Sequence, residues 1–235
     1  MLDRAAIVIP TFNEAENLER VVGLLRGLSA RMLIIVVDDG SPDGTGPLAE
    51  RLAERYAPMK VIHRKGKSGR GSACMAGFQD ALARPDIDVV VEMDADMSHD
   101  PKELPDTVAA LGGADMVIRS RYLPQSRIVN WSKRRLYFSK LANVFARWVL
   151  NVDISDLTNG YRAYRRKTAA AIELSQIRSS GYIVLSSVAY QLLRKGFRIV
   201  ELPSVFVNRT RGQSNFSLRE IEDAFLGILK LRFLS

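Results

Sequence analysis

The chain has 235 residues, of which 47% are hydrophobic and 26% are charged, a balance typical of one folded domain and not of a disordered protein. A formal net charge of +8 predicts an anionic partner: nucleic acid, an anionic membrane surface or a phosphorylated ligand. The single cysteine, Cys74, excludes an internal disulfide framework, and no apolar run is long enough for a signal-peptide core or a bilayer span. We therefore expect a soluble or peripheral protein.

Strands and helices alternate in the first half of the sequence. Apolar runs rich in β-branched residues predict strands near residues 5–9, 32–37, 59–63, 88–93 and 115–120. Apolar residues at helical spacing predict helices over 13–28 and 46–56. This order predicts an α/β fold with a doubly wound, mostly parallel central sheet flanked by helices, in a single domain. Ligands of such sheets bind at the carboxyl ends of the strands.

The pattern changes after residue 120. The sequence predicts a basic helix over 131–150, a strand over 161–166, a helix over 181–195, a strand over 198–207 and a tail helix over 217–234. The aromatic residues of the basic helix pack in the core or face a membrane interface, whose anionic headgroups attract Lys and Arg. These aromatic residues are Trp131, Tyr137, Phe145 and Trp148. The predicted apolar face of the tail helix consists of Leu218, Ile221, Phe225, Ile228 and Leu229.

Two polar clusters follow the first two predicted strands, "PTFNE" at 10–14 and "DDGSPDGT" at 38–45. Both have the composition of turns, and Asn13 or Asp43 would cap the following helix. Because Asp38 and Asp39 are adjacent at a strand exit, their side chains point in opposite directions. Asp39 is a candidate to bind a ribose or a base edge.

A third cluster lies in "VVVEMDADMSHDPKEL", at 89–104. Asp100 and Glu103, with a proline between them, have the spacing of a capping box and are expected to serve a helix start. Asp94 and Asp96 come directly after the strand, where a turn lets both reach one ion. Oxygen ligands of this kind suit Mg²⁺ or Mn²⁺. The alternative is a pair of turn or capping aspartates.

Basic residues lie in "HRKGKSGRGSA", at 63–73, ahead of a predicted helix, which is where an anion would be held. The alternative is a solvated basic loop. The segment matches neither a P-loop nor a dinucleotide-binding fingerprint. Cys74 is interpreted as a packing residue. Further charge comes from Arg119, Arg121, Arg134, Arg135, Arg209 and Arg211.

Eight motifs occur together along nearly the whole chain: "PTFNEAENL", "VDDGSPDGT", "KSGRGSACMAGF", "MDADMSHDP", "RSRY", "WSKRRLYFSKLAN", "SDLTNGYRAYRR" and "FVNRTRG". In this order and spacing the sequence resembles the inverting GT-A glycosyltransferases, specifically the polyprenol (dolichyl) phosphate mannose synthase family. The resemblance implies a nucleotide site at Pro10, Phe12, Glu14, Val37 and Asp39. It implies a metal and diphosphate site at Asp94, Ala95 and Asp96, with Ser98 as a third metal ligand.

The resemblance also implies residues for the diphosphate and the acceptor. Arg121, Arg135 and Ser139 match positions near both, and Arg209 matches an arginine on a closing loop. Asp156 matches an acid on the acceptor side, an orienting residue first and a general base second. The catalytic candidates are Asp96, Arg121 and Asp156. The family usually has lysine where this chain has Asn215, and our hypothesis is that Arg211 replaces it at the phosphates; the alternative is a solvated Arg211.

The reaction implied by the resemblance transfers a sugar from a nucleoside diphosphate to a polyprenyl or dolichyl phosphate with inversion, using Mg²⁺ or Mn²⁺. Mannose from GDP-mannose rests on the resemblance alone; the alternatives are another donor, such as a UDP-sugar, or a non-lipid acceptor. A nucleic-acid binder is disfavoured because no recognition motif is present. We expect a nucleotide half at 1–120, an acceptor half with amphipathic helices at 121–235, and a peripheral position on the cytoplasmic face of a membrane. A separate membrane-anchoring partner is left open.

Overall fold

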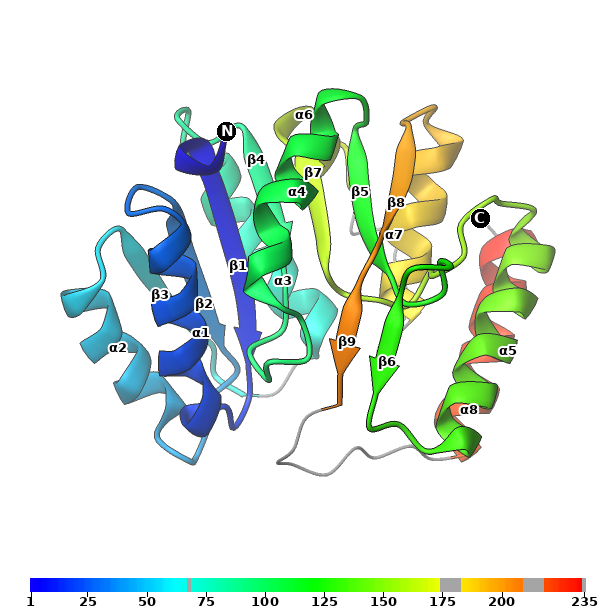
Figure 1. Ribbon diagram of the computed structural model, residues 1–235, viewed down its shortest axis with the longest axis horizontal. Helices are drawn as coiled ribbons and strands as arrows, with labels where there is room; N and C mark the ends of the chain where they lie inside the picture. The colour runs from blue at the N-terminus through cyan, green and yellow to red at the C-terminus, as the bar shows by residue number, and fades with distance from the viewer. Residues whose placement is uncertain (67–68, 174–182, 209–217, 234–235) are drawn as a thin grey trace.

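The computed structural model describes residues 1–66, 69–173, 183–208 and 218–233, whose strands form a central sheet with helices on both faces (Figure 1). The first elements are β1 (Ala5–Thr11), α1 (Ala15–Leu28), β2 (Leu33–Asp38), α2 (Thr45–Arg55), β3 (Met59–His63), α3 (Arg70–Leu82), β4 (Val89–Glu92), η2 (Pro101–Glu103), α4 (Leu104–Ala109) and β5 (Met116–Ser120). The later elements are β6 (Arg127–Val129), α5 (Lys133–Leu150), β7 (Arg162–Arg165), α6 (Arg166–Ala170), α7 (Ile183–Arg194), β8 (Ile199–Pro203), β9 (Val205–Val207) and α8 (Leu218–Phe233). The predicted α/β class is confirmed.

The central sheet has the strand order β3-β2-β1-β4-β7-β5-β8. Neighbouring strands run parallel except at β7, which is antiparallel to both β4 and β5. Strands β2 and β4 flank β1, so the carboxyl ends of these three strands meet at one edge of the sheet. Strands β6 and β9 pair in a separate small sheet beside that edge (Figure 1).

Alternate residues of the central strands face two separate cores. Ile7 and Ile9 of β1 pack with α1, α2 and α4, whereas Ala6 and Val8 pack with α3, α5, α7 and α8. All four side chains are fully buried. Because successive side chains of a strand point to opposite faces, continuous apolar runs are what a sheet covered on both faces requires. The strands that end at the site are therefore held rigidly from both sides.

Helix α8 packs against α5 at the end of the molecule away from β3 (Figure 1). The ring centroids of Phe145 on α5 and Phe225 on α8 are 4.4 Å apart. Ile228 is buried as predicted, but Leu229 is exposed, so the buried face of the tail helix is narrower than its apolar pattern indicates. Among the helices described, none combines the length and apolar character needed to cross a bilayer.

Helix α5 differs from its prediction in two respects. Ser132 accepts a hydrogen bond from the Arg135 backbone N–H and caps a helix that starts at Lys133, so Trp131 lies before the helix and not on it. Tyr137 and Trp148 are 67% and 78% exposed, which rules out the core-packing alternative for these two rings. The helix therefore presents aromatic side chains to the surroundings.

Prolines account for two differences between predicted and observed strands. Strand β1 continues through Pro10 to Thr11, because its pairing with β4 ends at Val8 and Pro10 pairs only with β2. The strand predicted over 198–207 is two strands, since β8 ends at Pro203 and β9 begins at Val205 in the small sheet. The break lets one segment contribute to both sheets.

The predicted capping box forms only in part. Asp100 accepts a hydrogen bond from the Lys102 backbone N–H at 3.0 Å and caps the short helix η2. Glu103 instead accepts hydrogen bonds from the Ser204 hydroxyl and the Val205 backbone N–H, both at 2.8 Å. Sequence spacing identified the cap but not the partner more than one hundred residues away.

Candidate active site

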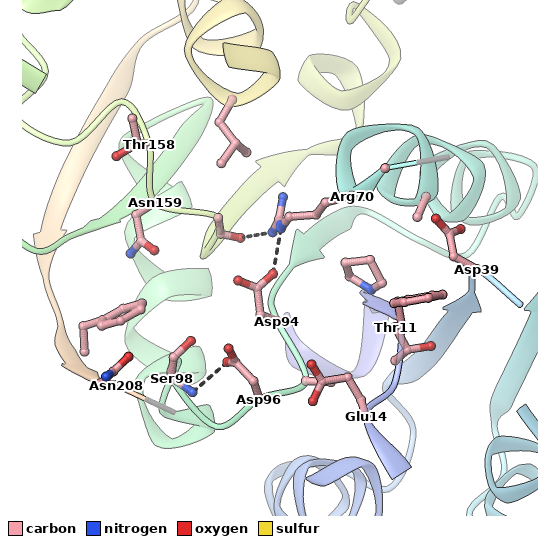
Figure 2. A pocket seen from close by; sticks show the side chains of 18 of the residues that line it. Thr11, Glu14, Asp39, Arg70, Asp94, Asp96, Ser98, Thr158, Asn159 and Asn208 are labelled. Atoms are coloured by element: carbon pink, nitrogen blue, oxygen red, sulfur yellow. Dashed lines mark hydrogen bonds and ion pairs between the residues drawn. The ribbon is translucent and has the colours of Figure 1, made fainter. Parts of the chain in front are cut away.

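A cavity of about 310 Å³ lies at the carboxyl edge of the sheet (Figure 2). One side comes from the ends of β1, β2 and β4 and from the start of α3. The other side comes from the residues after β5, the start of α5, the segment before β7 (residues 153–160) and the end of β9. This is the position at which an α/β sheet with this winding binds ligands. Segments from most of the chain therefore meet in one concave site.

The loop after β4 carries the predicted metal ligands. Figure 2 shows Asp94 and Asp96 on this loop, and Glu14 from the β1–α1 connection also lines the cavity. The Asp96 carboxylate accepts a hydrogen bond from the Ser98 backbone N–H at 3.0 Å, which fixes the turn between them. Within the described part of the chain, the buried Ser98 Oγ has no hydrogen-bond partner although it lies at the cavity. Buried polar atoms are normally paired, so this orphaned oxygen, next to two carboxylates, fits a divalent cation.

The ends of β1 and β2 are joined by short-range hydrogen bonds. Asp43 accepts from the Ala15 backbone N–H at 3.1 Å and from the Thr45 backbone N–H at 3.0 Å, so it serves the starts of both α1 and α2. Desolvation acts against the charge of Asp43, but these hydrogen bonds outweigh it and lower its pKa. Asp38 faces Thr11, whereas Asp39 faces the cavity and pairs with Arg64 at 2.8 Å. This arrangement is consistent with the prediction that the two adjacent side chains point in opposite directions.

Arg70, the first residue of α3, lies inside the cavity wall. Its Nε donates to Asp94 Oδ1 and its Nη1 to Glu92 Oε2, both at 2.7 Å, and its Nη2 donates to the Gly160 carbonyl at 2.9 Å. Burial disfavours the guanidinium charge, but the two carboxylates outweigh it and raise the pKa of Arg70. The Arg70 side chain thus connects β4, the loop after β4 and the segment before β7 (Figure 2).

His99 connects the same loop to the segment before β7 by a second route. The Asp94 backbone N–H donates to His99 Nδ1 at 3.0 Å, so the ring proton lies on Nε2, which donates to Asn159 Oδ1 at 2.9 Å. The Asn159 amide in turn donates to the Arg119 carbonyl. His99 is fully buried and stacks on Tyr161 with ring centroids 5.2 Å apart. This buried chain of hydrogen bonds fixes the tautomer of His99 and holds the backbone of the loop after β4 at Asp94.

Across the cavity, Arg121 forms a buried ion pair with Asp156. Its Nε and Nη2 donate to the two carboxylate oxygens at 2.7 and 2.8 Å, and its backbone N–H donates to Oδ2 at 3.0 Å. Burial would raise the pKa of Asp156, but the charge and hydrogen bonds of Arg121 outweigh that effect and lower it. Asp156 therefore stays ionised behind Arg121, and its contacts fit a positioning role.

Aromatic rings surround this arginine. The Arg121 guanidinium carbon lies 5.4 Å from the ring centroids of both Trp131 and Phe206. The Arg135 guanidinium carbon also lies over the Trp131 ring, 4.2 Å from its centroid. Its Nη1 donates to Asn208 Oδ1 at 2.9 Å. Rings around a cation limit its rotation and its solvation. Two guanidinium groups are thus held at the cavity in defined orientations.

The segment before β7 is tied to three other elements. Asn143 of α5 accepts from the Leu157 backbone N–H at 2.8 Å, and its amide donates to Thr158 Oγ1 at 3.1 Å. Glu201 of β8 accepts from the Asp156 backbone N–H at 2.9 Å. The fully buried Arg162 donates to the carbonyls of two residues in the segment, Leu157 and Asn159. This satisfied polar network makes the segment rigid although it is a loop.

Most residues predicted for the site line the cavity: Pro10, Phe12, Glu14, Asp39, Asp94, Ala95, Asp96, Ser98, Arg121 and Arg135. Val37, Ser139 and Asp156 do not line it. Val37 is buried in β2, and Ser139 accepts a hydrogen bond from the Tyr122 hydroxyl at 2.7 Å. Arg209, Arg211 and Asn215 lie outside the described residues. The hypothesis that Arg211 replaces the family lysine therefore stays a prediction.

Two other expectations about cations and the thiol have clear outcomes. Arg119 is buried and donates to Thr107 and to backbone carbonyls, so it offers no charge to a ligand. Cys74 is buried, and burial raises the pKa of its thiol, which confirms its interpretation as a packing residue. In the basic segment, Arg64 and Arg70 are paired with carboxylates. The alternative of a solvated basic loop therefore does not hold for these two residues.

Ten cavity residues were not among the predicted site residues: Thr11, Gly69, Arg70, Ala73, Thr158, Asn159, Gly160, Leu185, Phe206 and Asn208. All of them except Leu185 belong to motifs that carried the resemblance, namely "PTFNEAENL", "KSGRGSACMAGF", "SDLTNGYRAYRR" and "FVNRTRG". The motifs signalled their importance, but only the fold shows that their side chains reach the same cavity.

Known proteins similar to this chain agree with this architecture. Residues 6–172 match Glycosyl transferase family 2. The chain is 44% identical over 227 residues to polyprenol monophosphomannose synthase of Mycolicibacterium smegmatis, covering 96% of this chain and 85% of that protein. It is 41% identical over 227 residues to undecaprenyl-phosphate mannosyltransferase of Micrococcus luteus, covering 97% of this chain and 93% of that protein.

A solved structure shares the fold at lower identity. It is glucosyl-3-phosphoglycerate synthase from Mycobacterium tuberculosis in complex with Mn²⁺, UDP and glucosyl-3-phosphoglycerate. The TM-score is 0.67 at 21% identity, covering 97% of this chain and 79% of that one. The likeness supports the GT-A fold.

The sheet order, the cavity at its carboxyl edge and the matched residues together define a glycosyltransferase of family 2. Within that family, identities above 40% over nearly the whole chain place it in the polyprenol phosphate mannose synthase branch. The family resemblance seen in the sequence motifs is thereby confirmed.

Proposed function

We propose that this enzyme transfers mannose from GDP-mannose to a polyprenyl phosphate, with inversion at the sugar and with a divalent cation as cofactor. The observation that carries the proposal is the cavity itself, which combines an acidic loop suited to a cation with two oriented guanidinium groups. The names of the two relatives, a polyprenol monophosphomannose synthase and an undecaprenyl-phosphate mannosyltransferase, support the sugar and the lipid acceptor.

The cation would be held by Asp94, Asp96 and Ser98. Their oxygens are hard ligands, and Mg²⁺ or Mn²⁺ bound by few protein groups keeps positions for substrate phosphates. When bound, the cation would stabilise the negative charge that grows on the leaving diphosphate. Ala95 between the two aspartates is buried, which anchors the loop from beneath.

On the nucleotide side, we propose that Phe12, Glu14 and Asp39 hold the nucleoside of the donor. These residues come from the ends of β1 and β2 and line the cavity. Asp39 is braced by its ion pair with Arg64, so a hydrogen-bonding ligand would meet a carboxylate in a fixed position. Pro10 lies beneath them in the same wall.

On the acceptor side, Arg121 and Arg135 would orient phosphate groups. A guanidinium is permanently charged and donates hydrogen bonds to phosphate oxygens, and both groups are already fixed by aromatic rings and hydrogen bonds. A phosphate monoester has a second pKa of about 6 and is mostly dianionic at pH 7. The nucleophile thus needs orientation more than deprotonation, which agrees with an Asp156 committed to Arg121.

We also propose that the α5–α8 surface binds the membrane that contains the acceptor. On α5 the exposed apolar side chains follow a helical spacing of four, three and four residues: Tyr137, Leu141, Val144 and Trp148. Helix α8 adds the exposed Leu226, Leu229 and Phe233. Exposed basic residues on the same helices are Lys133, Arg134, Lys140, Arg147, Lys230 and Arg232. Apolar and aromatic side chains beside Lys and Arg suit a membrane interface with anionic lipids, and a chain with one buried, unpaired cysteine fits the cytoplasmic face.

The test is transfer with a matched panel of donors. The purified enzyme is incubated with Mn²⁺, a short polyprenyl phosphate and one of GDP-mannose, GDP-glucose, UDP-glucose or UDP-mannose. We expect a lipid-linked mannose only from GDP-mannose, with the anomeric configuration opposite to that of the donor by NMR. Equal transfer from a UDP-sugar, a retained configuration, or full transfer in excess EDTA would each contradict the corresponding part of the proposal.

A further inference from the structure

Arg70 places a fixed positive charge against one of the two proposed aspartate ligands. Its Nε is 2.7 Å from Asp94 Oδ1, and its other nitrogens donate to Glu92 and to the Gly160 carbonyl. A guanidinium has a fixed fork of donors, so these contacts together set its orientation. Figure 2 shows it entering the cavity wall between Asp94 and the segment before β7.

The surroundings are built for this side chain. A Cβ atom on Gly160 would lie 2.2 Å from Arg70 Nη2, so any other residue there would displace the guanidinium. Glu92 is 3% exposed and accepts a second hydrogen bond, from the Tyr164 hydroxyl at 2.6 Å. The buried carboxylate therefore holds Arg70 from one side while Asp94 holds it from the other.

A cation in this position has an electrostatic consequence for a second cation. Arg70 offsets negative charge on one oxygen of a proposed ligand carboxylate, and it would repel a divalent ion bound there, because like charges a few ångströms apart repel more strongly in a protein site than in bulk water. A diphosphate bound in the cavity would bring negative charge that offsets the repulsion. The protein alone then has weak affinity for the metal, and the protein with a nucleotide has much stronger affinity.

We propose that Arg70 suppresses binding of the divalent cation until the nucleoside diphosphate is present, so that metal and donor bind as a unit. This inference rests on the proposed metal-dependent transfer. Glu92 moderates the effect, because it shares the guanidinium with Asp94. Without the Glu92 charge, Arg70 interacts electrostatically with Asp94 alone and the metal binds less tightly.

Two variants therefore shift the metal affinity in opposite directions. Glu92→Gln keeps Arg70 and retains an oxygen for the Tyr164 hydroxyl. The double variant Arg70→Met with Glu92→Gln removes both charges of the buried pair, so the net charge of the protein is unchanged. Replacing a buried pair by uncharged groups is usually tolerated, unlike removing one partner.

The experiment measures Mn²⁺ binding by the electron paramagnetic resonance signal of free Mn²⁺, with and without GDP. We expect the double variant to bind Mn²⁺ without GDP about tenfold more tightly than the wild type, which corresponds to about 1.4 kcal/mol. Glu92→Gln should bind it several-fold more weakly. The strengthening by GDP should be smaller in the double variant than in the wild type. Thermal unfolding of each variant checks the fold, and Arg70→Gln with Glu92→Gln replaces the double variant if that one does not fold.

The outcomes separate this inference from the proposed function. Unchanged or weaker Mn²⁺ binding in the double variant would overturn the role of Arg70, even if the enzyme remains metal-dependent. Wild-type protein that binds no Mn²⁺ even with GDP would overturn the metal site and, with it, this inference. Wild-type binding that Asp96→Asn abolishes confirms the site independently of Arg70.

Discussion

The two walls of the cavity are built in different ways. We call Glu14, Asp39, Asp94 and Asp96 the acidic wall, and Arg121 and Arg135 the cationic wall. The acidic wall comes from the ends of three adjacent parallel strands, each followed directly by its functional residues. The cationic wall depends on partners far away in the sequence, such as Asp156 and Asn208. A local sequence pattern thus marks the residues of the acidic wall, whereas the partners that orient the cationic wall are apparent only in the folded chain.

Asp94 of the acidic wall and the Arg121–Asp156 pair of the cationic wall differ also in exposure. The Asp94 side chain is 32% exposed, as a ligand site that must exchange its contents requires. The Arg121 and Asp156 side chains are 7% and 0% exposed, so this ion pair is part of the interior. We infer that Asp94 and Asp96 can be substituted with little loss of stability, whereas the Arg121–Asp156 pair also stabilises the fold. The following predictions test this contrast.

The largest effect is expected in the acidic wall. Asp96→Asn removes a ligand charge and should lower kcat/KM at least about 1000-fold, or about 4 kcal/mol, because a metal contributes several kcal/mol to the stabilisation of developing charge. Its melting temperature should stay close to that of the wild type. The measurement is transfer at several Mn²⁺ concentrations beside a melting curve. Asp106→Asn, an exposed aspartate on α4, is the control and should remain active.

The cationic wall should respond in stability. Asp156→Asn leaves the Arg121 charge buried without a counter-charge and should lower the free energy of unfolding by about 3 kcal/mol, measured in urea. Asp153→Asn, three residues earlier, is the matched control. Its carboxylate is 93% exposed in a surface ion pair with Arg147, and such pairs contribute about 0–1 kcal/mol. Equal stability of the two variants would remove the distinction between the walls.

A smaller effect is expected at the surface. Trp148→Ser should reduce sedimentation with anionic vesicles about tenfold, or about 1.4 kcal/mol, because its ring is 78% exposed on α5. Wild-type binding should weaken as salt rises, since exposed charges are screened beyond about 8 Å at physiological ionic strength. Val129→Ser on β6 is the control for an exposed apolar residue elsewhere. Equal vesicle binding by Trp148→Ser and wild type would locate the lipid contact away from α5.

The smallest effect is a difference in pH dependence. The pKa of Asp156 is lowered in the folded protein, so its contribution to stability is fully present above its unfolded pKa, about 3.9, and is lost as pH falls through the lower folded value. Between pH 5 and pH 2 the wild type should therefore lose more stability than Asp156→Asn does. Urea unfolding at each pH measures both. If the stability of the wild type and of Asp156→Asn falls in parallel with pH, the pKa of Asp156 does not differ between the folded and the unfolded chain, and the prediction is wrong.

The contrast between the walls also explains what the sequence could predict. The strands, their order of appearance and the functional aspartates follow from local signals, because a buried parallel strand is a continuous apolar run and its end is marked by polar residues. Asp94 and Asp96 were found in this way. Asp39 was found because it follows Asp38 at a strand exit.

Long-range pairing could not be predicted. The sequence shows Arg70 as one of several cations in a glycine-rich segment, and nothing local indicates that it reaches Asp94 and Gly160. His99 carries no signal either, because the acceptor of its Nε2 proton, Asn159, lies 60 residues later in the sequence. Glu103 has the spacing of a capping residue but contacts Ser204 and Val205. In each case the determining partner is supplied by the sheet topology.

The reversed direction of β7 has a consequence for how such an enzyme can diversify. Strands β1, β2, β4 and β5 end at the cavity, whereas β7 begins there, so residues that precede β7 line it. Thr158, Asn159 and Gly160 line the cavity, while the buried Asp156 beside them holds Arg121. A change at 153–160 would therefore alter the shape of the cavity and the stability of the fold together. The loops that precede the parallel strands carry no such double role, because they lie at the opposite edge of the sheet.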